Sequence, residues 1–188
     1  MKKIIILFLI FIFTASGCKT KQALVTEPPV AAEPAADPEP ALNFSEQSTW
    51  LLGYVNPLQM TRFPHSEWYR DEFNNYRAAD DVVKKLKAIS TDDLSILIVL
   101  GTWCPDSRRE VPRFMRIMES WGFPEGSLEF IGVDNTKIAP VGDYEKLNIE
   151  RVPTFIISKN NIETGRIIEN PVTSLEQDML NILTGNQK

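Results

Sequence analysis

The 188-residue chain has only two cysteines, Cys18 and Cys104, and a single histidine, His65. So few soft ligands disfavour a metal site within one chain, and no metal ligands are predicted. The formal net charge is −5 and no basic run follows the first residues, which disfavours nucleic-acid binding. No glycine-rich phosphate loop follows any predicted strand, so we expect no nucleotide or flavin cofactor.

The first 17 residues have the features of an export signal. Lys2 and Lys3 precede an apolar run at residues 4–13, which is too short to predict a spanning helix. Residues 15–18, Ala-Ser-Gly-Cys, resemble the cleavage box of bacterial lipoproteins, which implies that Cys18 becomes the lipidated N-terminus. The alternatives are an ordinary secretory signal cleaved near Gly17 or an uncleaved anchor. We expect a lipid-anchored protein of the bacterial cell envelope, facing the periplasm.

Two further regions follow the signal. Residues 18–43 are rich in Ala, Pro, Glu and Thr without amphipathic period, which predicts a disordered tether after the lipidated cysteine. Residues 44–188 are long enough for one domain with its own core. If Cys18 carries lipid, Cys104 is the only free thiol of the exported chain, and no disulfide can form within it.

The chemistry of the domain is predicted to centre on Cys104. Residues 96–100, Ile-Leu-Ile-Val-Leu, are typical of a buried strand that delivers Cys104 into the following loop. Pro105 suits the first turn of a helix, and Phe114, Ile117, Met118 and Trp121 give that helix an apolar stripe. Backbone N–H groups at a helix N-terminus favour the thiolate. The alternative is a buried structural cysteine.

These residues resemble the thioredoxin family over roughly residues 94–183. The resemblance rests on Trp103-Cys104-Pro105-Asp106-Ser107, on Pro112 within the helix, and on Arg151-Val152-Pro153 before a second apolar strand. It implies an α/β thioredoxin fold, with a central mixed sheet flanked by helices, here with an N-terminal helical extension. It also implies that Pro153 is a cis-proline facing Cys104.

The chain departs from the family at two positions. Ser107 stands where the family has its second, resolving cysteine, and a serine hydroxyl cannot release a mixed disulfide. Ile98 stands where thioredoxins usually carry a buried acid that helps proton transfer. The expected function is therefore monothiol thiol–disulfide exchange through Cys104, as isomerase, reductase or relay. Ser107 and Arg108 would stabilise the thiolate, whereas Arg109 is expected on a solvated helix face.

The expected partners are protein disulfides or small thiols, together with an external thiol reductant and the membrane that holds the lipid. The alternative is a binding or adaptor module of the same fold, in which Cys104 captures partner proteins without turnover. Metal chaperoning is a weaker third option, since it would need two Cys104 thiolates shared by a dimer.

The remaining pattern predicts the elements around this centre. Residues 50–57 favour an N-terminal strand, and Pro64 is expected to open one long helix whose apolar face includes Tyr69, Phe73, Tyr76, Ala79, Val83 and Leu86. The aromatic residues near its start, Trp68 included, suggest either a ligand site or, preferably, packing against the sheet. Later residues predict a parallel strand at 127–134, a helical link at 143–147, a hairpin of strands 155–157 and 164–168 joined at 159–161, and a closing helix at 174–183 capped by Ser174.

Overall fold

A computed structural model of the chain describes residues 43–186. The predicted signal peptide, Cys18 and, except for Asn43, the predicted tether lie outside these residues. The described part forms a five-stranded mixed sheet flanked by helices, in the order β1-β3-β2-β4-β5. The strands are β1 (Gly53–Tyr54), β2 (Leu94–Leu100), β3 (Leu128–Gly132), β4 (Thr154–Lys159) and β5 (Ile162–Ile168). No helix of residues 43–186 is long and apolar enough to cross a membrane.

Strand β2 lies at the centre of the sheet, as its apolar sequence predicts. It runs parallel to β3 and antiparallel to β4, with Ile98 between Phe130 and Phe155 in the register. The alternation of a strand sends Ile96, Ile98 and Leu100 to one face and Leu97 and Val99 to the other. Because β2 is covered on both faces, its C-terminal end holds the following loop on a rigid support.

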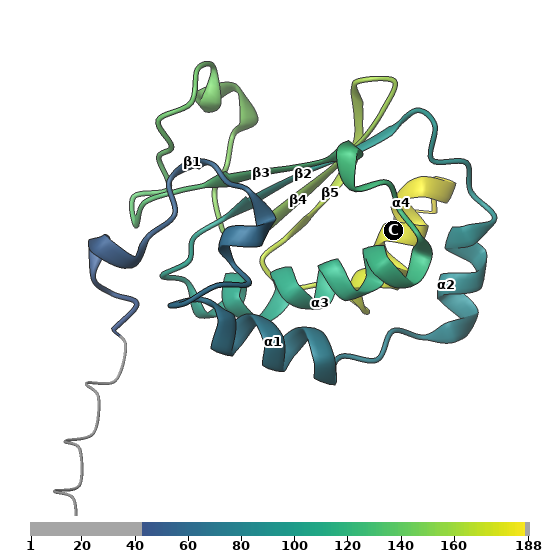
Figure 1. Ribbon diagram of the computed structural model, residues 1–188. Helices are drawn as coiled ribbons and strands as arrows, with labels where there is room; N and C mark the ends of the chain where they lie inside the picture. Colours follow the sequence, from purple (N-terminus) through teal and green to yellow (C-terminus); the bar gives the residue numbers. More distant parts are fainter. Residues whose placement is uncertain (1–42, 187–188) are drawn as a thin grey trace, which may run out of the picture. The chain divides into compact units, whose positions relative to one another are not determined.

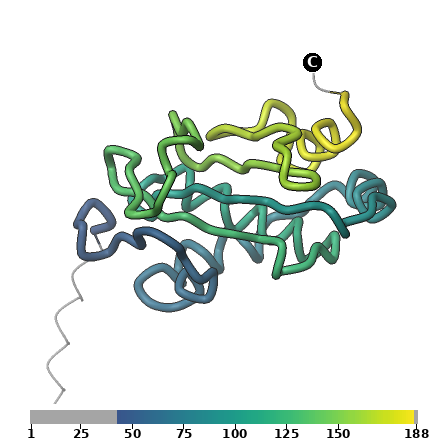
Figure 2. Tube along the Cα trace, turned by 90° about the horizontal axis from the view of Figure 1, so that it is seen from above, coloured from purple at the N-terminus to yellow at the C-terminus, as the bar shows by residue number. Residues whose placement is uncertain are grey.

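The helices cover one face of the sheet. They are α1 (Ser66–Asn75), α2 (Asp80–Lys87), α3 (Pro105–Trp121) and α4 (Leu175–Thr184), and all four contribute to a single apolar core with β2 and β4. Figure 1 shows α3 beneath the sheet and α1 beneath α3. The opposite face is covered by the segment after β3, which contains the short 3-10 turn η4 (Tyr144–Leu147). Figure 2 shows the strands side by side from above.

The expected single long helix after Pro64 is wrong, because the structure has two helices there. Helix α1 begins at Ser66, and the chain becomes extended at Tyr76 before α2 begins at Asp80. The Glu176 carboxylate on α4 accepts hydrogen bonds from the Tyr76 hydroxyl (2.7 Å) and the Ala79 N–H (3.0 Å), which holds this linker open. Ala79 is consequently exposed, although the helical pattern predicted it on the apolar face.

The aromatic residues near Pro64 pack in the interior, which was the preferred interpretation. They pack mainly against helix α3 and the core, whereas packing against the sheet was expected. Tyr69 is buried in the main core, and Trp68, Phe73 and Tyr76 pack against that core from its edge. The guanidinium groups of Arg116 and Arg113, both on α3, lie over the rings of Phe73 and Tyr76 respectively. These rings therefore join α1 to α3.

The other predicted elements differ from the structure mainly in their bounds. The N-terminal strand is reduced to Gly53–Tyr54, antiparallel to β3, and residues 57–59 form a 3-10 turn instead. The hairpin β4–β5 turns at Asn160 and Asn161, both with positive φ (51° and 61°), and β5 starts at Ile162, two residues earlier than predicted. Two residues with positive φ are the usual requirement of a two-residue hairpin turn. Ser174 caps α4 as predicted, by accepting a hydrogen bond from the Gln177 N–H.

Candidate functional site

Cys104 is the N-cap residue of α3, directly after the turn that follows β2. Its φ and ψ are extended (−81° and 123°), Pro105 occupies the first helical position, and Pro112 lies within the helix as predicted. The first turn of a helix carries N–H groups without intrahelical partners, which favour negative charge nearby. Cys104 is 7% exposed, so the thiol lies at the rim of the protein interior.

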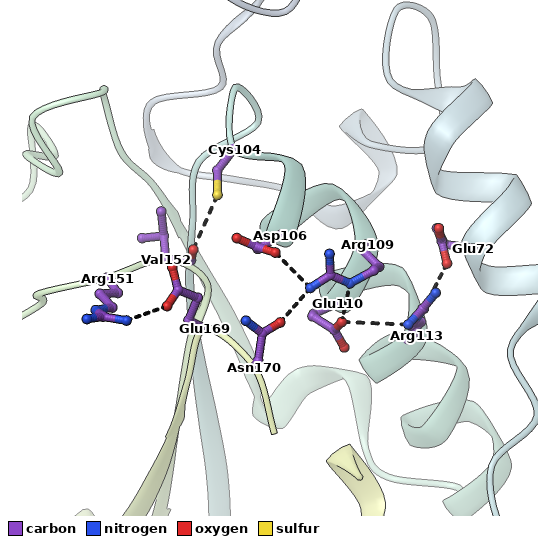
Figure 3. Close-up of polar contacts among 10 residues, drawn as sticks. All are labelled: Glu72, Cys104, Asp106, Arg109, Glu110, Arg113, Arg151, Val152, Glu169 and Asn170. Carbon is purple, nitrogen blue, oxygen red and sulfur yellow. Dashed lines mark hydrogen bonds and ion pairs between the residues drawn. The ribbon is translucent and has the colours of Figure 1, made fainter. Parts of the chain in front are cut away.

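The Cys104 thiol faces the segment before β4, 48 residues further along the chain. Its Sγ donates a hydrogen bond to the Val152 carbonyl oxygen at 3.3 Å, as Figure 3 shows. The peptide between Val152 and Pro153 is cis, as the resemblance implied, and both residues are buried. The structure therefore brings together three residues predicted for the site: Cys104, Val152 and Pro153.

Ser107 belongs to the same helical turn, but its hydroxyl does not bond the thiol. It is 1% exposed and accepts a hydrogen bond from the Gly101 N–H at 3.2 Å. Gly101 also leaves room for Trp103, since a Cβ at Gly101 would lie 2.6 Å from the indole ring. The Trp103 Nε1–H donates to the Val133 carbonyl oxygen at 2.9 Å. Hydrogen bonds to Ser107 and from Trp103 therefore hold the turn from Gly101 to Cys104 in place.

Arg108 reaches back over this turn from the helix. Its Nη1 donates to the carbonyl oxygens of Thr102 (3.2 Å) and Trp103 (3.1 Å), and its guanidinium lies 4.8 Å from the centre of the Phe44 ring. Burial lowers the pKa of Arg108, and the charge of Cys104 acts in the opposite direction. Burial, and then the charge of Arg108, lower the pKa of His65, which favours a neutral imidazole beside Phe44.

A second set of charges runs along α3, away from the thiol. Arg109 bridges Asp106 (2.7 Å) and the buried Glu110 (2.6 Å), and it also donates to Asn170 in the loop before α4. Arg113 extends this ladder from Glu110 (3.6 Å) to Glu72 of α1 (2.7 Å), as drawn in Figure 3. Arg109 is therefore part of an ion-pair network, which corrects the expectation of a merely solvated face. Residues 43–186 contain no group of three or more His, Cys, Asp or Glu side chains that could hold a metal ion.

Comparisons with known proteins leave the family open. The chain matches no family model and no curated protein. Among solved structures, it is similar to a protein of unknown function from Pseudomonas aeruginosa, with 15% identity, a TM-score of 0.47, and coverage of 65% of this chain and 82% of the other. It is also similar to an HIV epitope-scaffold, with 15% identity, a TM-score of 0.39, and coverage of 64% and 72%. Similarities at this level assign no activity.

Sequence reasoning missed several residues that surround the turn. Phe44 and His65 were not predicted near Arg108, since contacts between residues so far apart leave no periodic signal. Tyr144 was likewise missed: it packs in the small apolar cluster that contains Cys104, and its hydroxyl is buried with no hydrogen-bond partner in residues 43–186. Burial and the charge of Asp134 raise the pKa of Tyr144 to about 12. Tyr144 is therefore neutral near pH 7.

Proposed function

We propose that this protein is a thioredoxin-like, monothiol thiol–disulfide exchange protein that acts through Cys104. The observation that supports this most is the thiol at the start of α3, 3.3 Å from the carbonyl oxygen of Val152, next to the cis peptide of Pro153. The end of β2 and the start of α3, which follow one another in the chain, meet the distant start of β4 at this one sulfur. The central parallel and antiparallel pairing of β2 agrees with such a fold.

The proposed reaction begins with a thiolate at Cys104. The thiolate attacks one sulfur of a partner disulfide, a bond forms between that sulfur and Sγ, and the other partner sulfur leaves as a thiolate that takes up a proton from water. Because Ser107 cannot attack the mixed disulfide, a thiolate from an external reductant must attack its partner sulfur, which forms a new disulfide between reductant and partner and releases Cys104 as a thiolate. The electrons therefore come from that external thiol.

The surroundings of the sulfur suit this reaction in two ways. The helix N-terminus and the guanidinium of Arg108 place positive potential beside it, which attracts negatively charged partners. The backbone of Val152 lies in contact with the thiol, so an extended partner segment that displaces the Sγ–carbonyl bond would find hydrogen-bonding groups there. The buried Ile98 offers no proton transfer, which makes solvent the proton donor and acceptor.

A second candidate is a binding module that captures partners on Cys104 without turnover. It is favoured by the small exposed fraction of Cys104 (7%) and by the existing hydrogen bond of its thiol to Val152, both of which would slow attack by an external thiol. In that case the mixed disulfide would persist instead of being released by an external thiol.

The experiment treats the reduced full-length protein in detergent with glutathione disulfide and analyses the peptide that contains Cys104 by mass spectrometry. We expect one glutathione adduct on Cys104, none in Cys104→Ala at that position, and repeated release and re-formation when reduced glutathione is supplied. An adduct that forms once and resists the external thiol would favour the binding module. If folded protein forms no adduct on Cys104, the exchange function is wrong.

A further inference from the structure

The segment at residues 44–52 lies against the turn that carries Cys104. The Thr102 hydroxyl donates to the Thr49 carbonyl oxygen (3.4 Å) and accepts from the Leu51 N–H (3.2 Å). The ring of Trp50 lies 6.3 Å from that of Trp103. A Cβ at Gly132 would lie 2.0 Å from the Leu51 oxygen, so this glycine permits the close approach of the segment. Residues 44–52 therefore form part of the site, although they belong to no strand of the sheet.

Within this segment, the side chain of Phe44 contacts the positively charged Arg108. Its ring lies under the Arg108 guanidinium, 4.8 Å from ring centre to Cζ, and its own carbonyl oxygen accepts from the Trp50 Nε1–H at 2.9 Å. The face of an aromatic ring carries partial negative charge and attracts a guanidinium. His65 packs on the same ring, with 5.9 Å between centres, and so limits where Phe44 can move.

Arg108 differs from the other arginines of α3. Arg109, Arg113 and Arg116 each pair with a carboxylate, whereas Arg108 has no carboxylate partner in residues 43–186. Its hydrogen-bond partners in residues 43–186 are two carbonyl oxygens, one of them in the peptide that leads into Cys104. Because no carboxylate neutralises its charge, such a cation attracts an anion that forms nearby more strongly than a paired cation would. That anion is the Cys104 thiolate or a negatively charged group that approaches it.

We propose that Phe44 is a positioning residue for the thiol: it holds the Arg108 guanidinium against the Thr102–Trp103 turn, so that its charge acts at Cys104. The inference rests on the proposed thiol chemistry, and it adds a residue outside the strand–turn–helix unit to the site. The charge of Arg108 would raise the reactivity of Cys104 toward anionic partners more than toward neutral ones. A site without the arginine would lack this preference.

The test compares the alkylation rates of Cys104 by iodoacetate, an anion, and by neutral iodoacetamide. The Cys104 thiolate attacks both reagents and displaces iodide, so the ratio of the iodoacetate rate to the iodoacetamide rate cancels the thiolate fraction and reports the local charge. The rates are measured on the full-length protein in detergent, at the peptide that contains Cys104. We expect Arg108→Gln to lower the ratio about threefold or more, and Phe44→Ala and Phe44→Leu to lower it about twofold or more.

Phe44→Tyr keeps the ring and should retain the wild-type ratio, and Tyr54→Ala, which truncates an aromatic side chain that is 67% exposed, should retain it too. If Phe44→Ala is not folded by circular dichroism, Phe44→Leu and Phe44→Tyr carry the comparison. A ratio unchanged in Phe44→Leu while Arg108→Gln lowers it would overturn the role of Phe44. A ratio unchanged in Arg108→Gln would overturn the role of both. A folded protein whose Cys104 reacts with neither reagent would instead remove the thiol chemistry on which the inference rests.

Discussion

At the scale of single residues, Ser107 limits the chemistry proposed for Cys104. Ser107 is the third residue of α3 and Cys104 is its N-cap, and these two positions of a helix lie within mutual side-chain reach. The Ser107 hydroxyl is occupied by the Gly101 N–H, so it fastens the turn instead of contacting the sulfur. A thiol at this position would still lie in the same turn as Cys104.

We therefore expect Ser107→Cys to form a disulfide with Cys104 under mild oxidation, since the first-turn spacing brings the two sulfurs within bonding distance. The measurement is the loss of both free thiols by differential alkylation, with the linked peptides identified by mass spectrometry. The variant should then reduce insulin when a dithiol is supplied, whereas the natural protein should accumulate mixed disulfides.

Ser120→Cys is the matched control for this bond. It adds a cysteine to the same helix but 16 residues from Cys104, about 24 Å along the helix axis at 1.5 Å per residue. No bond between Cys104 and position 120 should form within one chain. A folded Ser107→Cys variant that keeps two free thiols would contradict the proposed geometry of the site.

At the scale of elements, α3 is fastened by a ladder of charges that contains a buried carboxylate. Glu110 is 4% exposed and lies between Arg109 and Arg113, which are themselves partly exposed and continue to Asp106 and Glu72. Removing the central carboxylate leaves two cations close together with no anion between them. Loss of one member of a buried pair is much more costly than loss of a surface pair.

We expect Glu110→Ala to lower the free energy of unfolding by about 1–3 kcal/mol, less than for a fully buried pair because both arginines reach solvent. Glu119→Ala is the matched control, because it removes the same side chain from the same helix, where Glu119 pairs with Arg116 at the exposed surface. Its cost should be about 0–1 kcal/mol. Urea denaturation followed by circular dichroism measures both, and equal losses would mean that the buried ladder contributes nothing special to stability.

The elements that could be predicted from sequence are those with local causes. The apolar run of β2, the proline at the start of α3, the two asparagines of the β4–β5 turn and the Ser174 cap each act within a few residues. The division between α1 and α2 could not be predicted, because the apolar period continues across it. It is imposed by Glu176, which bonds Tyr76 and Ala79 from about one hundred residues away.

The candidate site shows the same limit. The motif around Cys104 and the peptide before Pro153 could be read as a pair through a family resemblance. The contact of Phe44 with Arg108 could not, because neither residue carries a pattern that refers to the other. Residues 44–52 show no long strand or helix, and their role appears only where Thr49, Leu51 and Trp50 meet the turn.

At the scale of the whole molecule, the chain's two cysteines have separate predicted tasks. Cys18 follows the predicted signal sequence and is expected to carry lipid, whereas Cys104 lies in the folded domain with its thiol free. Acyl chains on the first residue anchor a protein stably, because two or more such chains together bind a membrane far more tightly than one. If the tasks are independent, each can be removed while the other is kept.

We expect Cys18→Ser to release the protein from the membrane fraction, or to leave its precursor unprocessed, while Cys104 still forms its adduct with glutathione. Cys104→Ser should do the reverse: the mature chain keeps its acyl mass and its place in the membrane fraction, but the adduct is lost. Cell fractionation and mass spectrometry of the mature N-terminus measure the first property, and mass spectrometry of the Cys104 peptide measures the second. Each variant serves as the control for the other, since both replace one thiol by a hydroxyl. A mature wild-type chain that starts at a residue other than Cys18 and carries no acyl group would refute the anchor, and it would leave the chemistry proposed for Cys104 untouched.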